Sequence, residues 1–376
     1  MARRSNAEQI CKELNVRLDQ PDSSLVEAIL WKLGFPMQPR LDVRDDYWRH
    51  HENLESFAST ADSNLGLNEE RLRELSSNYF VSLERFLHDS IAFLTWALLN
   101  DHHTSEQSYV YFELSGKEFT KSKLNEVNAG TRSRAEDDLS DNPNLSQLVQ
   151  AYTRLSKKLE SLRGREQEWN RPASTTPEFV AKTRLQQFPF DHLVPFLDLT
   201  AESQVRLVET LGAVASDLND SGIMTARNGL LHAKQETPSL AEVRAALDRS
   251  RRALDRLEQI GAVRTTFRVA ASAVNSWGRW TIVMESNGKE IEFSSPSPYS
   301  WLGLPGFTTP QYLLHGALFA RPNEMLRFRE GVASDYQKYW AGYEQRPEAG
   351  NRVLANQSEN LATPMETGSF VSAKAD

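Results

Sequence analysis

This sequence of 376 residues has a single cysteine, no long apolar run and no positive net charge. Its single cysteine, Cys11, excludes an intrachain disulfide framework and a thiolate-rich zinc site. The longest strongly apolar run, from Ile91 to Leu99, is far shorter than the roughly 20 residues that a membrane span needs. The amino-terminal residues lack the apolar core of a signal peptide. We therefore expect a cytoplasmic protein with no membrane partner.

The formal net charge is −8, so the whole protein has no positive field that would attract nucleic acid. Contact with RNA or DNA would need a local basic patch. Hydrophobic residues make up 39% of the chain and charged residues 25%, which excludes wholesale disorder and a fibrous repeat. The length alone favours about two folding units.

Helical periodicity dominates the chain and predicts a mainly α protein. Good capping residues precede several of the periodic stretches, as at Asn68 and Thr200. The predicted helices are Asn68 to Asn100, Leu145 to Leu162, Thr200 to Leu218 and Ser239 to Ile260.

The second half of the helix predicted from Asn68 to Asn100 is apolar on most sides, which indicates burial against several other elements. Glu84, His88 and Asp89 interrupt that apolar surface. Such residues usually satisfy a local hydrogen bond, although they could also support a site across the bundle.

Two other parts of the chain have a different character. Tyr109 to Leu114 is aromatic and β-branched and predicts a strand, whereas Lys117 to Asn144 is predicted to be a solvated loop. From residue 264 the pattern changes to strands, and Ser286-Asn287-Gly288-Lys289 predicts a hairpin. Tyr312 to Phe319 and Glu324 to Trp340 are expected to be helices that complete a small α+β part.

Neither of the two candidate metal sites is complete. His50 and His51 point to different sides of a helix, so we interpret them as a surface or interface pair. The acidic cluster from Asp137 to Asp141 lacks the spacing and the glycine of a calcium loop, which argues against a metal-dependent nuclease. Four aromatic residues near the hairpin are interpreted as core in preference to a stacking surface for bases: Trp277, Trp280, Tyr299 and Trp301.

The run Arg227-Asn228-Gly229-Leu230-Leu231-His232 is where residue types and spacing together suggest chemistry. An arginine carries a fixed charge and forked donors that suit phosphate oxygens, and a histidine can move a proton near neutral pH. The run resembles the signature of the HEPN superfamily, in which four to six residues separate an arginine from a histidine. A polar residue commonly follows the arginine, and Asn228 fills that position.

This resemblance implies a HEPN-like helical bundle with the motif in its C-terminal part, at or near a helix end. The implied organisation is an N-terminal helical segment at 1–66, the bundle at 67–262 with a large insertion at about 101–199, a small α+β region at 263–343, and a disordered tail at 344–376.

The resemblance also implies a metal-independent endoribonuclease that needs no cofactor. It would act as a homodimer whose two motifs face each other, as in toxin and antiviral defence systems. His232 would remove the proton of a 2′-hydroxyl or protonate the leaving oxygen. Arg227 would hold the phosphate, and Asn228 would orient His232 or contact the phosphate.

RNA would be attracted by basic residues that follow the motif, of which Lys234, Arg244 and Arg251 are the candidates. An ordinary solvated helix face with ion pairs is the alternative for these residues. A second class of function is a non-catalytic HEPN-like module that dimerises or binds a nucleotide or a regulatory protein partner.

Overall fold

The computed structural model describes the chain in segments, and everything below refers to them: 43–60, 65–102, 109–129, 138–172, 190–219, 221–231, 238–286, 288–295, 300, 303–307, 310–320 and 323–331. Side chains at 65–68, 127–129 and 221 are not described. Several predictions fall outside these segments, namely those for His232, Lys234, Tyr299, Trp301 and the tail from 344 to 376.

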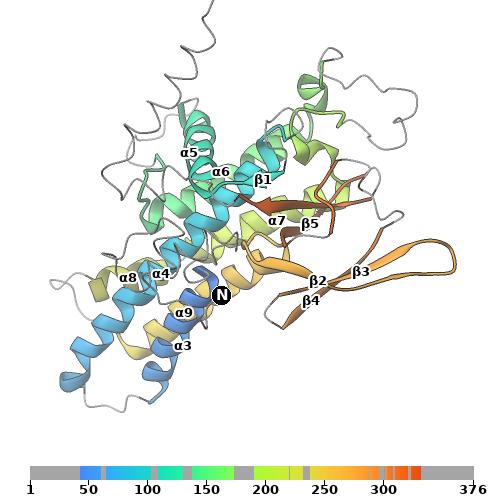
Figure 1. Ribbon diagram of the computed structural model, residues 1–376. Helices are drawn as coiled ribbons and strands as arrows, with labels where there is room; N and C mark the ends of the chain where they lie inside the picture. Colours follow the sequence, from blue (N-terminus) through green and yellow to red (C-terminus); the bar gives the residue numbers. More distant parts are fainter. Residues whose placement is uncertain are drawn as a thin grey trace, which may run out of the picture. The chain divides into compact units, whose positions relative to one another are not determined.

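Helices make up 60% of the described residues, which confirms the prediction of a mainly α protein. Two short 3-10 helices, η2 (Glu166–Trp169) and η4 (Pro195–Asp198), accompany them. The α-helices labelled in Figure 1 are α3 (Val43–Thr60), α4 (Leu65–Leu99), α5 (Glu113–Ala129), α6 (Leu145–Leu162), α7 (Ala201–Leu218), α8 (Ser221–Leu231) and α9 (Leu240–Gln259).

Capping residues explain where the predicted helices begin. The Thr200 hydroxyl accepts a hydrogen bond from the Ser203 amide, and α7 starts directly after it. Ser239 forms a reciprocal capping box with Glu242 at the start of α9. Helix α4 begins at Leu65, about one turn before the predicted cap.

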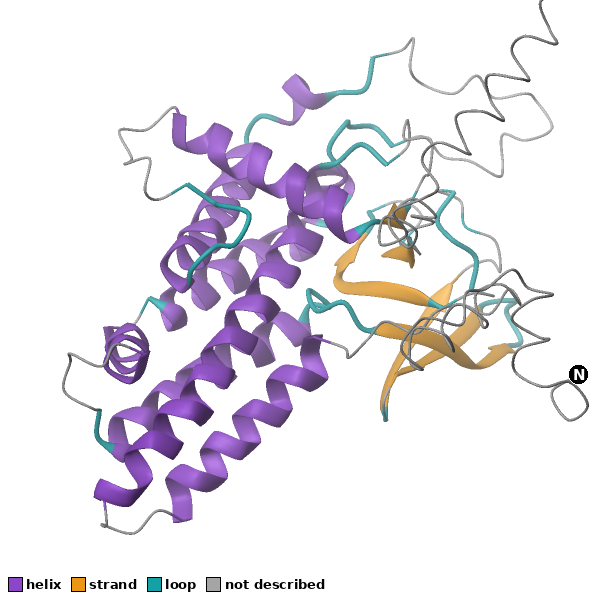
Figure 2. Ribbon diagram, turned by 60° about the vertical axis from the view of Figure 1, so that its left-hand side comes forward, coloured by secondary structure: helices purple, strands orange, loops and turns teal. Residues whose placement is uncertain are grey.

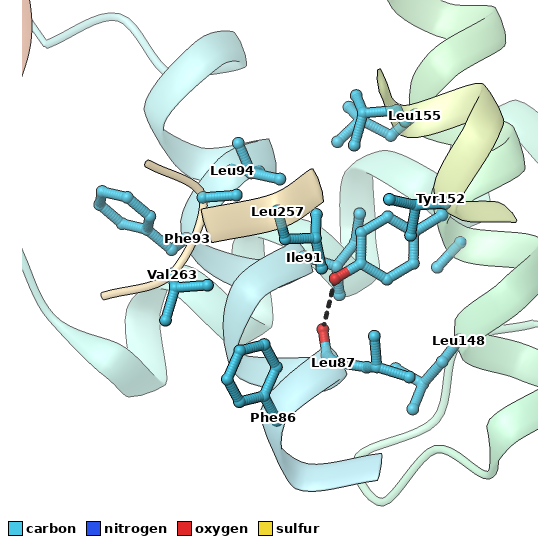
Figure 3. Close-up of a cluster of buried hydrophobic side chains, with 14 of the residues drawn as sticks. Phe86, Leu87, Ile91, Phe93, Leu94, Leu148, Tyr152, Leu155, Leu257 and Val263 are labelled. Carbon is cyan, nitrogen blue, oxygen red and sulfur yellow. Dashed lines mark hydrogen bonds between the residues drawn. The ribbon is translucent and has the colours of Figure 1, made fainter. Parts of the chain in front are cut away.

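Helix α4 is the centre of the core, and it packs against α3, α5, α6 and α8. Every side chain from Ser90 to Leu98 is buried. Figure 3 shows the core between α4, α6 and α9, where the Tyr152 hydroxyl donates a 3.0 Å hydrogen bond to the Leu87 carbonyl. Within the described segments, none of the helices combines the length and apolar character that crossing a bilayer requires.

The predicted loop from Lys117 to Asn144 is wrong over its first half, because α5 occupies Glu113–Ala129. The predicted strand shrinks to β1, Val110–Tyr111. The buried side of α5 mixes Gly116 and Thr120 with a single fully buried leucine, Leu124, and the Thr120 hydroxyl donates to the Ala92 carbonyl of α4 at 3.1 Å. Helical spacing of apolar residues is therefore weak in this segment, although the segment is helical.

Six strands form one sheet, in the order β1-β6-β5-β2-β3-β4. Strand β1 runs parallel to β6, and the other neighbours are antiparallel. The sheet lies beside the helices (Figure 2), and β5 contacts α7. The remaining strands are β2 (Thr266–Val274), β3 (Trp280–Ser286), β4 (Lys289–Ser295), β5 (Gln311–Leu318) and β6 (Met325–Glu330).

The β3–β4 hairpin confirms the Asn-Gly prediction, with Ser286 opposite Lys289. The helix predicted from Tyr312 to Phe319 is wrong, since this segment forms β5. The helix predicted from Glu324 to Trp340 is wrong over its described part, which forms β6, and residues 332–340 lie outside the described residues. Both strands are buried along most of their length, so they show no alternation of apolar and polar residues. A short apolar run of this kind does not distinguish a buried strand from a buried helix.

Helix α9 ends where Gly261 brings the chain against β5. Gly261 has a φ of +74°, and a Cβ at this position would lie 2.7 Å from the His315 amide nitrogen and closer still to the Leu313 carbonyl oxygen. The Gly316 amide donates a 2.9 Å hydrogen bond to the Ile260 carbonyl. The junction between bundle and sheet thus requires a glycine.

Replacing Gly261 by alanine is expected to lower the free energy of unfolding by roughly 3 kcal/mol or more, through positive-φ strain and a backbone clash. Gly278 is the matched control, because its φ is also +74° but a Cβ there meets nothing within 4 Å. Gly278→Ala should cost only about 1 kcal/mol in urea unfolding. Equal losses in the two variants would contradict this close approach.

Candidate functional site

Arg227 and Asn228 lie on α8, the short helix that follows α7. Ile223, Ala226 and Leu230 bury one side of α8 in the core, and the helix contacts α4 and α9. Arg227 and Asn228 are each partly exposed. The helix therefore holds them at the border between the core and the solvent.

Arg227 is fixed by an ion pair that crosses the bundle. Its Nε donates to Oε1 of Glu84 on α4 at 2.8 Å, and its Nη2 lies 2.8 Å from the same oxygen. The Leu145 amide, at the start of α6, also donates to this oxygen at 3.2 Å. One carboxylate oxygen thus joins α4, α6 and α8, so Glu84 bonds across the bundle and not only within its own helix.

The pair leaves Arg227 accessible. The side chains of Arg227 and Glu84 are 19% and 20% exposed. The Nη1 of Arg227 reaches Asn228 Oδ1 at 3.4 Å, which is long for an N–H···O hydrogen bond. A phosphate oxygen could replace that weak contact while the ion pair with Glu84 continues to orient the guanidinium.

His88 lies one turn beyond Glu84 on the same side of α4 and is partly exposed. Burial, with a smaller contribution from Lys117, lowers its pKa to about 4, against the opposing effect of Asp89, Glu113 and Asp141. The imidazole is therefore neutral at pH 7 and a weak base, since it takes up a proton only near pH 4. The charges that act on the pKa of His88 come from its neighbour Asp89, from α5 and from Asp141, and the motif's own His232 is outside the described residues.

Asp89, the third polar residue in this part of α4, has a structural partner. Arg264 donates through Nε to Asp89 Oδ2 at 2.7 Å, and its Nη2 reaches Glu113 at 3.2 Å. The guanidinium also lies over the Tyr111 ring, 5.2 Å from its centroid. The Asp89–Arg264 pair is largely buried, and its opposite charges compensate each other. Together with Glu113, it links α4 to α5 and to the residues that precede β2.

Arg244 and Arg251 occupy different surroundings on α9. The Nε of Arg244 donates to the Ala58 carbonyl in the last turn of α3 at 3.0 Å, so this side chain holds α3 against α9. Arg251 is exposed, 4.0 Å from Asp255 and 6.0 Å from the centroid of the Trp48 ring. Both residues are exposed, so they differ in their partners and not in their access to solvent.

The described residues contain no group of three or more histidine, cysteine or acidic side chains that could hold a metal ion. His50 lies 3.5 Å from Asp46, and His51 lies 3.7 Å from Glu55. The expectation of a surface or interface pair is wrong for His51, which is 2% exposed and packs against the Tyr47 ring within the core.

Comparison of the chain with protein-family models, curated proteins and solved structures finds no match. The likeness to the HEPN superfamily therefore rests on the residues from Arg227 to His232 and on the helices around them.

A double-mutant cycle with Glu84→Gln and Arg227→Met should give a coupling energy of about 1 kcal/mol in urea unfolding, because both side chains are largely shielded from water. Any stability lost through the weaker contact of the Glu84→Gln side chain with the Leu145 amide is the same with and without Arg227, so it does not enter the coupling energy. The exposed pair of Arg163 and Glu160, 2.9 Å apart, is the control and should couple by less than about 0.5 kcal/mol. Equal coupling in the two pairs would argue against a fixed guanidinium.

His88 should titrate with a midpoint of about 4 in an NMR experiment on the ring nitrogens, with His88→Gln identifying the signal. Its folded-state pKa lies below the ordinary 6.5, so folding favours the neutral ring. The resulting contribution to stability is present above pH 6.5 and is lost as the pH falls toward 4. A midpoint near 6.5 would show that the ring is solvated.

Proposed function

We propose that this protein is a metal-independent endoribonuclease of the HEPN type. The observation that carries the proposal is the guanidinium of Arg227, which is partly exposed on α8 and oriented by Glu84 from α4, with Asn228 beside it. A cation whose position is fixed before the substrate arrives stabilises charge that develops on a phosphate without a cost of reorganisation.

The proposed reaction begins when a base takes the proton of a 2′-hydroxyl. That oxygen then forms a bond to the adjacent phosphorus, and the bond from phosphorus to the 5′-oxygen breaks. An acid gives a proton to the leaving oxygen, so the products are a 2′,3′-cyclic phosphate and a 5′-hydroxyl. Arg227 would bind the phosphate oxygens, and His232 would transfer the proton. Asn228 would orient His232 or contact the phosphate.

The wider proposal follows from the family that the motif resembles. The enzyme would be a cytoplasmic homodimer in which each protomer supplies one copy of Arg227 and His232 to a shared cleft. Its partner would be RNA, attracted by Arg251 and by Lys234, and its biological role would be that of a toxin or an antiphage defence protein.

The ion pair itself favours one alternative. Glu84 offsets the charge of Arg227 and links three helices, as a purely structural pair would. In that case the bundle is a non-catalytic HEPN-like module that dimerises or binds a nucleotide or a regulatory protein.

RNA cleavage in the presence of a chelator separates the two functions. Arg227→Ala and His232→Ala should each lower the cleavage rate by roughly 10²-fold to 10³-fold or more, because each removes a group that acts in the transition state. Arg163→Ala is the matched control, since Arg163 is a partly exposed arginine whose partner is the nearby Glu160. This variant should cleave like the wild type.

Cleavage that survives both substitutions at Arg227 and His232 would rule out the proposed site. Tight RNA binding without cleavage of any RNA would favour the non-catalytic module. Loss of activity on addition of the chelator alone would contradict the metal-independent mechanism.

A further inference from the structure

The β2–β3 hairpin extends beyond the part of the sheet that packs on β5. Strand β2 pairs with β5 only at Thr266 and Phe267 and then continues to Val274, paired with β3 alone (Figure 1). All residues from Arg268 to Arg279 are exposed. This distal part therefore presents its side chains to solvent.

The tip of the hairpin is an ordered turn. The Asn275 Oδ1 accepts hydrogen bonds from the Trp277 amide at 3.0 Å and from the Arg279 amide at 2.9 Å. The Gly278 amide donates to the Asn275 carbonyl at 2.9 Å, and Gly278 supplies the positive φ that the turn requires. The backbone thus fixes where Trp277 and Arg279 leave the turn.

Trp277 is 85% exposed at this tip, so its interpretation as a core residue is wrong. The neighbouring Trp280 is the one that packs, with the small cluster around Ile282 and Met284. An indole has a large apolar face, and holding it in water on an ordered turn gives the fold no packing energy. Its position indicates a surface for a partner.

The charge near Trp277 is positive, although the whole chain carries a net charge of −8. Arg279 is the charged residue of the tip, since no other charged side chain occurs between Val269 and Met284, whereas Arg268 lies at the other end of β2, opposite Glu285. On β4, Ser294 and Ser295 lie opposite Thr281 and Trp280, and Glu292 lies opposite Val283, further from the tip. Among the described residues of β2, β3 and β4, those nearest the tip carry no negative charge that would repel an anionic partner.

We propose that the tip of the β2–β3 hairpin, Asn275–Arg279, binds single-stranded RNA, with Trp277 stacking on a base and Arg279 contacting a phosphate. An exposed aromatic ring beside a cation is the combination that single-stranded nucleic acid uses. The choice of RNA rests on the proposed function, whereas the stacking surface does not.

A protein partner fits the hairpin less well. The edge of β2 beyond Phe267 carries small side chains from Ala270 to Ala273, which offer little apolar area for an added strand or a second copy of the chain. Val269 and Val274 are also exposed on β2, at 38% and 50%, but the largest exposed apolar group, Trp277, stands at the tip and not along that edge. A base stacked on its face would cover it.

The test measures affinity for a fluorescent, 2′-O-methylated single strand of roughly 12 nucleotides, a length within the range of one single-strand binding module. The 2′-O-methyl groups prevent cleavage, so the full wild-type chain can be used. Trp277→Ala should weaken binding by about 5-fold to 150-fold, the range for loss of one base stack, and Trp277→Phe should retain most of the affinity. Arg279→Gln should reduce the slope of log affinity against log salt by about 1.

Val81→Ala is the matched control, because Val81 is an apolar residue on α4 that is 60% exposed. It should leave RNA affinity unchanged, and neither Val81→Ala nor Trp277→Ala should change the melting temperature. Unchanged affinity in Trp277→Ala would overturn the proposal, as would equal affinity for single-stranded and duplex RNA. The proposal would also be overturned if Trp277→Ala abolished a dimer, or binding to anionic vesicles, but left the affinity for RNA unchanged.

The hairpin and the proposed nuclease can fail separately. Trp277-dependent binding in a protein that cleaves no RNA would overturn the nuclease and leave the hairpin proposal standing. Cleavage that depends on Arg227 while Trp277→Ala binds normally would overturn only the hairpin proposal.

Discussion

Complete burial of the second half of α4 is the constraint on which the rest of the structure depends. Because every side chain from Ser90 to Leu98 is buried, α4 needs neighbours on all sides in this half. Helices α5 and α6 supply part of the cover, and rings from the sheet supply more, since Phe93 contacts Tyr312 and Phe328. The buried Asp89 is acceptable there because Arg264 pairs with it.

The candidate site lies where this burial ends. Glu84 and His88 are the last partly exposed polar residues of α4 before the buried stretch, and Glu84 contacts α8 and the start of α6. Glu84 can therefore satisfy two donors from different helices and still leave Arg227 partly in water. The same packing that stabilises the bundle fixes the cation that the proposed chemistry needs.

Local signals predicted the parts of the fold that local interactions control. The caps at Thr200 and Ser239 and the Asn-Gly turn gave correct boundaries, because each satisfies nearby backbone groups. Helix α5 was missed, since its buried side includes Gly116 and Thr120, and β5 was mistaken for a helix because both of its faces are covered. Such contacts are set by distant segments, which periodicity does not report.

The motif at Arg227 was visible in the sequence, but Glu84 is 143 positions away and only the folded chain identifies it as the partner. The central claim is that this oriented arginine serves cleavage by an RNA 2′-hydroxyl. The most direct measurement compares, with a chelator present, one RNA with the same RNA carrying 2′-deoxy sugars throughout. The account predicts that only the first is cleaved and that it leaves 2′,3′-cyclic phosphate ends. Cleavage of both, or of neither until a metal ion is added, would contradict it.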